Sequence, residues 1–126
     1  MPYTISHHAN PNIVEVAFVD IISSSDLREA TTKAIAFQKE SGVNRFLVHT
    51  NGSEVIAGLI DLFDIAESQY HAEGLNRNSR IAVVFPATLS AQAAANFYET
   101  ICQNRGWNAQ VHSDRQAAIN WLLVDI

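Results

Sequence analysis

The sequence predicts a single α/β domain with a mostly parallel sheet, and two observations support this. Short apolar stretches bounded by turn residues alternate with longer amphipathic stretches, as in sheets whose strands are joined by crossover helices. The stretch 79–86 contains five consecutive apolar residues, which is too short for a buried helix and suits a strand covered on both faces. The 126 residues are 48% hydrophobic and 17% charged, so one globular domain is expected over residues 1–126.

The chain begins with two strands, expected at residues 3–8 and 13–21, on either side of a turn that contains Pro11. Proline presets the backbone angle φ, and the asparagines beside it tolerate left-handed conformations, so the turn is short. Strands joined by a short turn pair as an antiparallel hairpin. We therefore expect the first strand to form an edge of the sheet.

Helix caps and apolar spacing place the other elements. The first helix is expected to begin at Ser25 or Asp26, with Glu29 in the position of a capping box, and to end at Gly42. The resulting order is β-β-α-β-α-β-α-β-α, a five-stranded, mostly parallel sheet with an antiparallel N-terminal edge strand and four helices. The remaining elements are strands at 45–50, 79–86 and 107–112, helices at 55–73 and 88–105, and a final helix capped by Ser113 with Gln116 three residues later.

Composition and charge exclude several classes of function. The net charge is −5, with 8 basic and 13 acidic residues, which argues against nonspecific nucleic-acid binding because such binding neutralises phosphates. The single cysteine, Cys102, cannot form an internal disulfide. No apolar run approaches the roughly 20 residues of a membrane span, and no signal peptide is visible. We expect a cytoplasmic protein without a membrane span.

The helix expected at 55–73 has a wider apolar surface than packing on a sheet requires. Projected at about 100° per residue, its apolar side chains fill an arc of roughly 160°, whereas a core-facing helix needs about 100°. Ile65 falls outside even that arc. This additional apolar surface either covers a wide sheet or forms an interface with another chain. The simplest such interface is a two-fold homodimer through Val55, Leu62 and Ile65.

Polar residues follow the predicted parallel strands at the edge where open α/β sheets bind ligands. Ser53 is placed to accept a phosphoryl group, or to bind an anion together with the backbone amides around it. The simpler interpretation is a helix cap after a turn. The residues are His49, Thr50, Asn51, Gly52 and Ser53 after one strand, and His112 and Asp114 at the last.

The same edge contains the parts of a nucleophile, a base and an orienting acid. Ser53 with His49 or His112 gives the hypothesis of a hydrolase, although no Gly-x-Ser-x-Gly elbow is present. The adjacent His7 and His8 would point to opposite faces of a strand, and no His-x-x-x-His spacing occurs. No metal and no cofactor is therefore expected.

Three stretches carry a family resemblance: Gly-Val-Asn-Arg-Phe-Leu-Val at 42–48, Arg-Ile-Ala-Val-Val at 80–84, and the run from 104 to 122 that ends in Trp-Leu. They resemble the SpoIIAA-like proteins, small bacterial relatives of the STAS domain of anti-anti-sigma factors. The resemblance implies a sheet with helices largely on one side. It also implies a non-enzymatic regulatory or protein-interaction module, without a catalytic signature.

The resemblance bears on Ser53 and on possible ligands. In anti-anti-sigma factors, a serine at the start of the helix after a central strand is phosphorylated, and Ser53 is its nearest equivalent. Here a glycine precedes the serine, whereas the family pattern is an acidic residue, paired serines and then glycine. The alternative function is binding of a small apolar molecule or lipid, by analogy with CRAL-TRIO domains. Its pocket would be lined by Phe46, Ile60, Phe63 and Tyr70.

Overall fold

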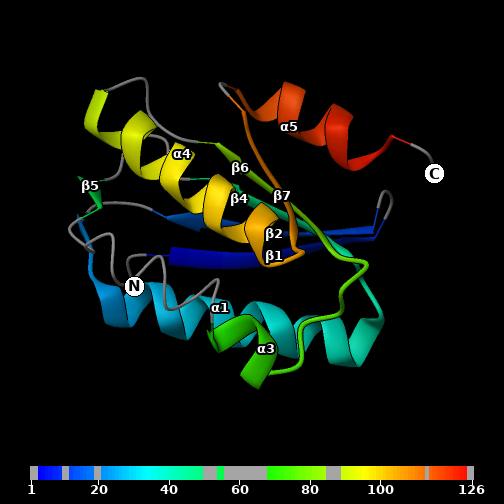
Figure 1. Ribbon diagram of the computed structural model, residues 1–126. Helices are drawn as coiled ribbons and strands as arrows, with labels where there is room; N and C mark the ends of the chain where they lie inside the picture. The colour runs from blue at the N-terminus through cyan, green and yellow to red at the C-terminus, as the bar shows by residue number, and fades with distance from the viewer. Residues whose placement is uncertain are drawn as a thin grey trace.

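The computed structural model describes residues 3–9, 12–18, 21–49, 54–55, 68–84, 89–112 and 114–124. Its main feature is a five-stranded sheet with strand order β1-β2-β4-β6-β7 (Figure 1). β1 runs antiparallel to β2 and the other neighbours are parallel, which confirms the predicted sheet. The strands are β1 (Tyr3–Ala9), β2 (Asn12–Phe18), β4 (Arg45–His49), β6 (Arg80–Val84) and β7 (Asn108–His112).

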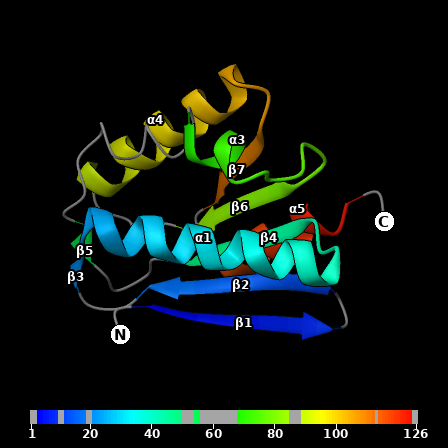
Figure 2. The ribbon, with the colours of Figure 1, turned by 90° about the horizontal axis from the view of Figure 1, so that it is seen from below.

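Helices cover both faces of this sheet (Figures 1 and 2). Three pack on one face: α1 (Ser24–Ser41), α3 (Tyr70–Ala72) and α4 (Leu89–Asn104). The last helix, α5 (Arg115–Leu122), lies alone on the other face, against β4, β6 and β7. No helix in the described part of the chain is long and apolar enough to cross a bilayer.

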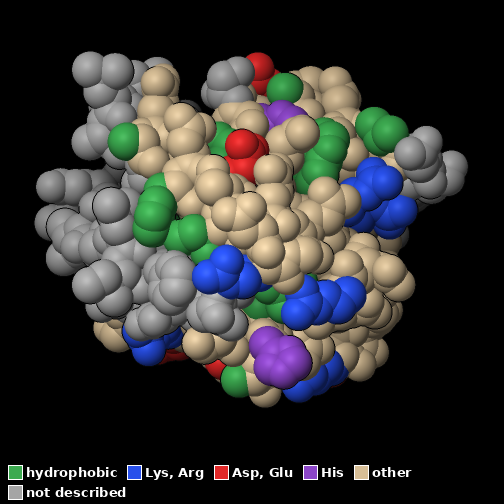
Figure 3. Space-filling model, in the orientation of Figure 1, with side chains coloured by type: hydrophobic (Ala, Val, Ile, Leu, Met, Phe, Trp, Pro, Cys, Tyr) green, Lys and Arg blue, Asp and Glu red, His purple; other side chains and the backbone are tan. Residues whose placement is uncertain are grey.

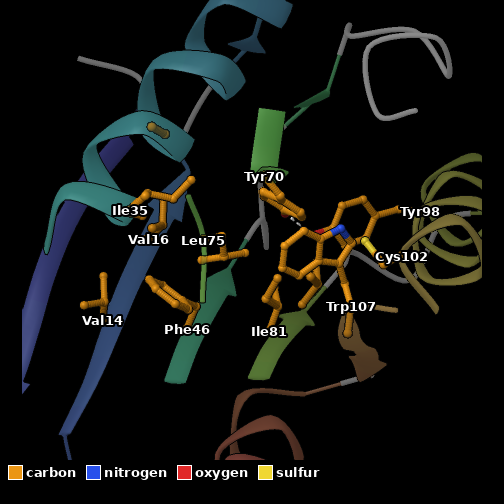
Figure 4. Close-up of a cluster of buried hydrophobic side chains, with 14 of the residues drawn as sticks. Val14, Val16, Ile35, Phe46, Tyr70, Leu75, Ile81, Tyr98, Cys102 and Trp107 are labelled. Atoms are coloured by element: carbon orange, nitrogen blue, oxygen red, sulfur yellow. Dashed lines mark hydrogen bonds between the residues drawn. The ribbon is translucent and has the colours of Figure 1, made fainter. Parts of the chain in front are cut away.

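Alternation along the strands produces two hydrophobic cores. Val14, Phe46, Ile81 and Ala109 are register partners across four strands and point into the larger core, beneath α1 and α4 (Figure 4). Their sequence neighbours point to the opposite face. There Leu47, Ala82 and Val84 form the smaller core with Ala118 and Leu122 of α5. The continuous apolar runs of the inner strands are thus explained by burial on both faces.

A second, two-stranded parallel sheet was not predicted. It pairs β3 (Ile21–Ile22) with β5 (Glu54–Val55), so Val55 lies in a strand and does not open a helix. Most of the helix expected at 55–73 falls outside the described residues. Its predicted end agrees with the structure, since α3 is followed by Gly74 with φ of 78°.

The predicted cap of the first helix is displaced by two or three residues. The N-cap is Ser23, whose hydroxyl accepts a hydrogen bond from the backbone N–H of Asp26 at 3.2 Å. The Asp26 carboxylate accepts in return from the Ser23 N–H at 3.0 Å, which completes a capping box. Glu29 has another role: it accepts a hydrogen bond from the Tyr3 hydroxyl. The predicted end at Gly42 is confirmed by its left-handed φ of 74°.

The cap of the last helix also differs from the prediction. Asp114 is the N-cap, and its carboxylate accepts a hydrogen bond from the Ala117 N–H at 2.8 Å. The assignment of Ser113 as cap was therefore wrong. Gln116 donates to Asn120 instead of closing a capping box. Serine and aspartate cap helices about equally well, so adjacent candidates cannot be ranked from sequence.

Candidate functional site

The carboxyl edge of the sheet brings two of the predicted residues onto one face. His49 is the register partner of Val84, and Val84 is the partner of His112. Partners in a parallel sheet project to the same side, here the side covered by α5. Neighbouring strands are about 4.8 Å apart, so the two histidines are separated by roughly 10 Å with Val84 between them. At this separation the two imidazole rings are too far apart to share a proton, so the arrangement is better suited to each histidine contacting a ligand separately.

His112 is the more unusual of the two. Its Nε2 atom is buried and has no hydrogen-bond partner in the described structure, and its ring lies 5.7 Å from that of Trp121. Burial lowers the pKa of His112, although Glu99 and Asp114 favour its protonated form. The imidazole is therefore neutral at physiological pH and able to accept a hydrogen bond.

The other predicted residues at this edge divide into two groups. Asp114 is committed to capping α5 through its carboxylate, so it does not orient a histidine in this structure. Thr50, Asn51, Gly52 and Ser53 lie outside the described residues. The phosphorylation site, the anion site and the hydrolase remain predictions.

The residues predicted to form an interface or an apolar pocket are only partly described. Leu62 and Ile65 lie outside the described residues, as do Ile60 and Phe63. Phe46 and Tyr70 are 4% and 7% exposed and belong to the larger core, where Figure 4 shows Leu75 beside Phe46. The two described members of the proposed pocket thus serve as packed core residues.

A polar group of side chains is buried within that core. The hydroxyls of Tyr70 and Tyr98 are hydrogen-bonded to each other, next to Cys102 and Trp107 (Figure 4). Burial raises the pKa of both phenols, and it raises the pKa of the Cys102 thiol to about 12. All three groups stay neutral at physiological pH. One phenol donates to the other, so both hydroxyls take part in a hydrogen bond and the pair has a structural explanation.

A shallow groove of about 520 Å³ runs between α1 and the segment around α3. Its polar side chains are bonded to one another: Gln69 donates to the Arg28 carbonyl at 2.9 Å and to Glu73 at 3.0 Å. Glu73 also accepts from Thr32 at 2.9 Å. These bonds fasten α3 to α1, so the groove has a structural role.

The amino edge of the sheet gathers most of the positive charge. Five of the eight basic residues lie there, although the chain as a whole has a net charge of −5. Figure 3 shows blue side chains on the side where β4 and β6 begin. Among the residues that the structure describes, Glu40 and Glu73 lie near Lys39, but the positive charges outnumber them. We call this surface the basic edge; it consists of Lys39, Arg45, Arg77, Arg80 and Arg105.

Arg77 is held in place by an aromatic ring. Its guanidinium lies 3.8 Å from the ring centroid of the buried Trp107, as in a cation–π contact. Its Nη1 donates to the carbonyl of Arg105 at 2.5 Å. Arg77 itself is exposed, so its charge is positioned on a rigid support and faces solvent.

Arg45 and Arg80 are register partners, and both reach the end of α5. Arg45 donates to the Leu122 carbonyl at 3.0 Å, and Arg80 donates to the carbonyls of Trp121 and Val124 at 3.2 and 2.5 Å. These carbonyls carry the negative end of the helix dipole, which explains why two cations are tolerated side by side. The pair fixes α5 to the sheet.

Sequence reasoning missed the basic edge because the basic residues are scattered along the chain. A signal was nevertheless present: each of the five lies at, or shortly before, the start of a parallel strand. The amino ends of parallel strands meet at one edge, just as their carboxyl ends do. The rule that collected His49 and His112 would have collected these residues as well.

Comparison with known proteins bears on the fold. No protein-family model matches the chain, and no curated protein matches it in sequence. A solved structure is similar over 95% of this chain and 91% of the other, with a TM-score of 0.60 and 13% identity. That protein is an uncharacterized member of the DUF3478 family with a SpoIIAA-like fold, from Shewanella loihica PV-4. The present fold is SpoIIAA-like. In this SpoIIAA-like fold, the described helices other than α5 share one face, as the sequence resemblance implied.

Proposed function

We propose that this SpoIIAA-like domain is a non-catalytic regulatory or protein-interaction module, and that its partner presents an acidic surface to the basic edge. The observation behind the proposal is the collection of five cationic side chains on one side of an acidic protein. Such separation of charge steers a complementary partner and fixes its orientation. The resemblance to relatives of anti-anti-sigma factors supports a regulatory role.

A protein partner agrees better with this surface than a nucleic acid does. A net charge of −5 repels a polyanion, whose binding requires many phosphate contacts. A guanidinium group has five N–H donors and binds a carboxylate with two parallel hydrogen bonds, so arginines held in place by a ring or by carbonyls suit an acidic partner. Acidic side chains on a folded partner or a peptide satisfy this chemistry.

Charge reversal at the basic edge tests the proposal. The variant Lys39→Glu with Arg105→Glu changes two exposed positions and leaves the arginines that hold α5. The matched control, Arg28→Glu with Lys33→Glu, makes the same charge change on α1. We expect proteins captured from native cells to bind wild type and control alike, and to bind the edge variant about tenfold more weakly.

The readout is quantitative mass spectrometry of the captured material, with circular dichroism to confirm that each variant folds. Added salt should weaken the interaction, since exposed charges are screened. Equal capture by all three proteins would contradict the proposal. So would nucleic acid as the captured species.

A further inference from the structure

The two edge strands of the sheet, β7 and β1, differ in whether their outer backbone groups are covered. Side chains of α4 cover those of β7. On β7, the Val111 N–H donates to the Glu99 carboxylate at 2.7 Å, and the Ala109 carbonyl accepts from the Gln103 side chain at 3.2 Å. These backbone groups point away from β6, so side chains of α4 occupy the positions that another strand would use. The β7 edge is therefore closed to strand addition.

The β1 edge lacks this protection. β1 is seven residues long, and its pairing with β2 continues without a bulge from Tyr3 opposite Phe18 to Ala9 opposite Asn12. Its sequence contains no Lys, Arg, Asp, Glu or Pro. No described element lies beyond it (Figure 2). In the described structure nothing bonds to its outer backbone groups, although alternate residues must direct an N–H and a C=O outward.

We propose that β1 pairs in antiparallel fashion with β1 of a second copy, around a two-fold axis at Ser6, to give a continuous ten-stranded sheet. An axis through a residue pairs odd positions with odd and even with even. Every outward N–H then meets an outward C=O, whichever set of residues faces outward. The inference is independent of the basic edge.

The side chains of β1 are compatible with this pairing. The axis places Tyr3 opposite Ala9, Thr4 opposite His8 and Ile5 opposite His7 of the second copy, so no pair joins two like-charged Lys, Arg, Asp or Glu side chains. Ser6 meets its own copy, and both small side chains are exposed.

Apolar surface at the same margin favours a second copy. Ile5 and Phe37 are only partly buried, and the Phe37 ring lies 6.3 Å from the ring of His7. Pairing brings Ile5 against His7 of the second copy, beside its Phe37, and removes apolar surface from water in both molecules. The strand pair is smaller than a standard interface of about 1,600 Å², so we expect reversible, micromolar association.

Charged substitutions at Ser6 give a direct test by analytical ultracentrifugation at about 100 μM, a concentration suited to micromolar affinity. Ser6→Lys and Ser6→Glu each place like charges on the axis, so each should be monomeric. An equimolar mixture places opposite charges there and should restore the dimer. The matched control Ser6→Thr keeps a small, uncharged, strand-forming side chain and should dimerise like wild type.

Several results would overturn the proposal. They are a monomeric wild type, charged variants that remain dimeric, or a mixture that does not associate. Loss of the dimer in Ile65→Glu but not in Ser6→Lys would place the interface in residues 55–70 instead.

Amide hydrogen exchange on the wild-type protein tests the same pairing without any substitution, so it remains informative if a Ser6 variant fails to fold. Alternate amides of Tyr3–Ala9 should gain protection as the protein concentration rises. Protection that is independent of concentration would contradict strand pairing.

Discussion

At the scale of single residues, Glu15 connects parts of the chain that are distant in sequence. Its carboxylate on β2 accepts two hydrogen bonds from Arg115 of α5, at 2.8 and 3.0 Å, and lies 2.9 Å from the His8 ring on β1. The Arg115 guanidinium holds the pKa of Glu15 down to about 2, although partial burial opposes this shift. The ion pair thereby contributes to fixing α5 over the sheet.

The acid sensitivity of the protein should depend on this carboxylate. The pKa of Glu15 is lower in the folded than in the unfolded state, so its stabilisation is complete above pH about 4.5 and is lost as the pH falls towards 2. We expect Glu15→Gln to lower the free energy of unfolding at pH 7 by about 1–2 kcal/mol, allowing for solvent screening. The variant should also lose less stability than wild type between pH 5 and 2, a window set by those pKa values.

Urea unfolding across this pH range measures both effects. The control Glu40→Gln, at the exposed end of α1, should follow the wild-type curve. Identical pH dependence of wild type and Glu15→Gln would show that the ion pair does not contribute. The sequence predicted that Glu15 lies on a strand, but a partner 100 residues away leaves no local signal.

At the scale of elements, a buried glutamine joins α1 to the strands that follow. Gln38 is 6% exposed; its side-chain nitrogen donates to the Val43 carbonyl at 3.1 Å and to the Ser79 hydroxyl at 2.7 Å. Its oxygen accepts from the Asn76 N–H at 2.8 Å. The end of α1, the entry to β4 and the loop before β6 are thus held by one side chain.

Replacing this glutamine with leucine should destabilise the protein although leucine has a similar size. Gln38→Leu removes the side-chain partner of the buried Val43 carbonyl and of the buried Ser79 hydroxyl, and we expect a loss of about 2–4 kcal/mol. The control Ala36→Leu, at an exposed position of the same helix, should change the stability by less than about 0.5 kcal/mol. Chemical denaturation measures the stability of both variants. Equal unfolding midpoints would contradict the role of Gln38 in joining α1 to the strands.

The elements also show how far sequence reasoning extends. The five strands of the main sheet were predictable because β2, β4 and β6 are largely apolar and β1 and β7 alternate apolar with polar residues, with turn residues between the elements. β3 and β5 have two residues each, which is too short for any periodicity to show. The start of α1 was misplaced because three consecutive serines precede Asp26 and each is a competent cap. Local chemistry thus defines which elements exist better than it defines where they begin.

At the scale of the whole molecule, the smaller core depends on α5. Leu122 is fully buried among Ile13, Leu47, Ala82 and Val84, whereas Val124, two residues later, is 50% exposed. We expect Leu122→Ala to lower the free energy of unfolding by about 2–4 kcal/mol through lost burial and a residual cavity. Val124→Ala should cost less than about 0.5 kcal/mol. Thermal and urea unfolding compare the two, and similar losses would show that α5 is loosely attached.

The candidate sites were predictable only where a general rule was applied to the whole sheet. The carboxyl edge was found because ligands usually bind there, and His49 and His112 do lie on one face. The basic edge was missed because charges were compared along the chain and not across the strands. β1 was predicted as an edge strand, but only the structure shows that α4 closes the opposite edge. Both the grouping of charges across the strands and the covering of an edge by a helix depend on contacts between residues distant in sequence. They can therefore be recognised only in the three-dimensional structure.

The solitary position of α5 has a consequence for synthesis in the cell. The helices α1, α3 and α4 can pack on the larger core while the chain is still growing, but the opposite side of the sheet stays uncovered until residues 115–122 have left the ribosome. During that interval the nascent chain exposes Leu47, Ala82 and Val84. A translational pause or a chaperone acting in this interval would affect the yield of native protein more than one acting earlier.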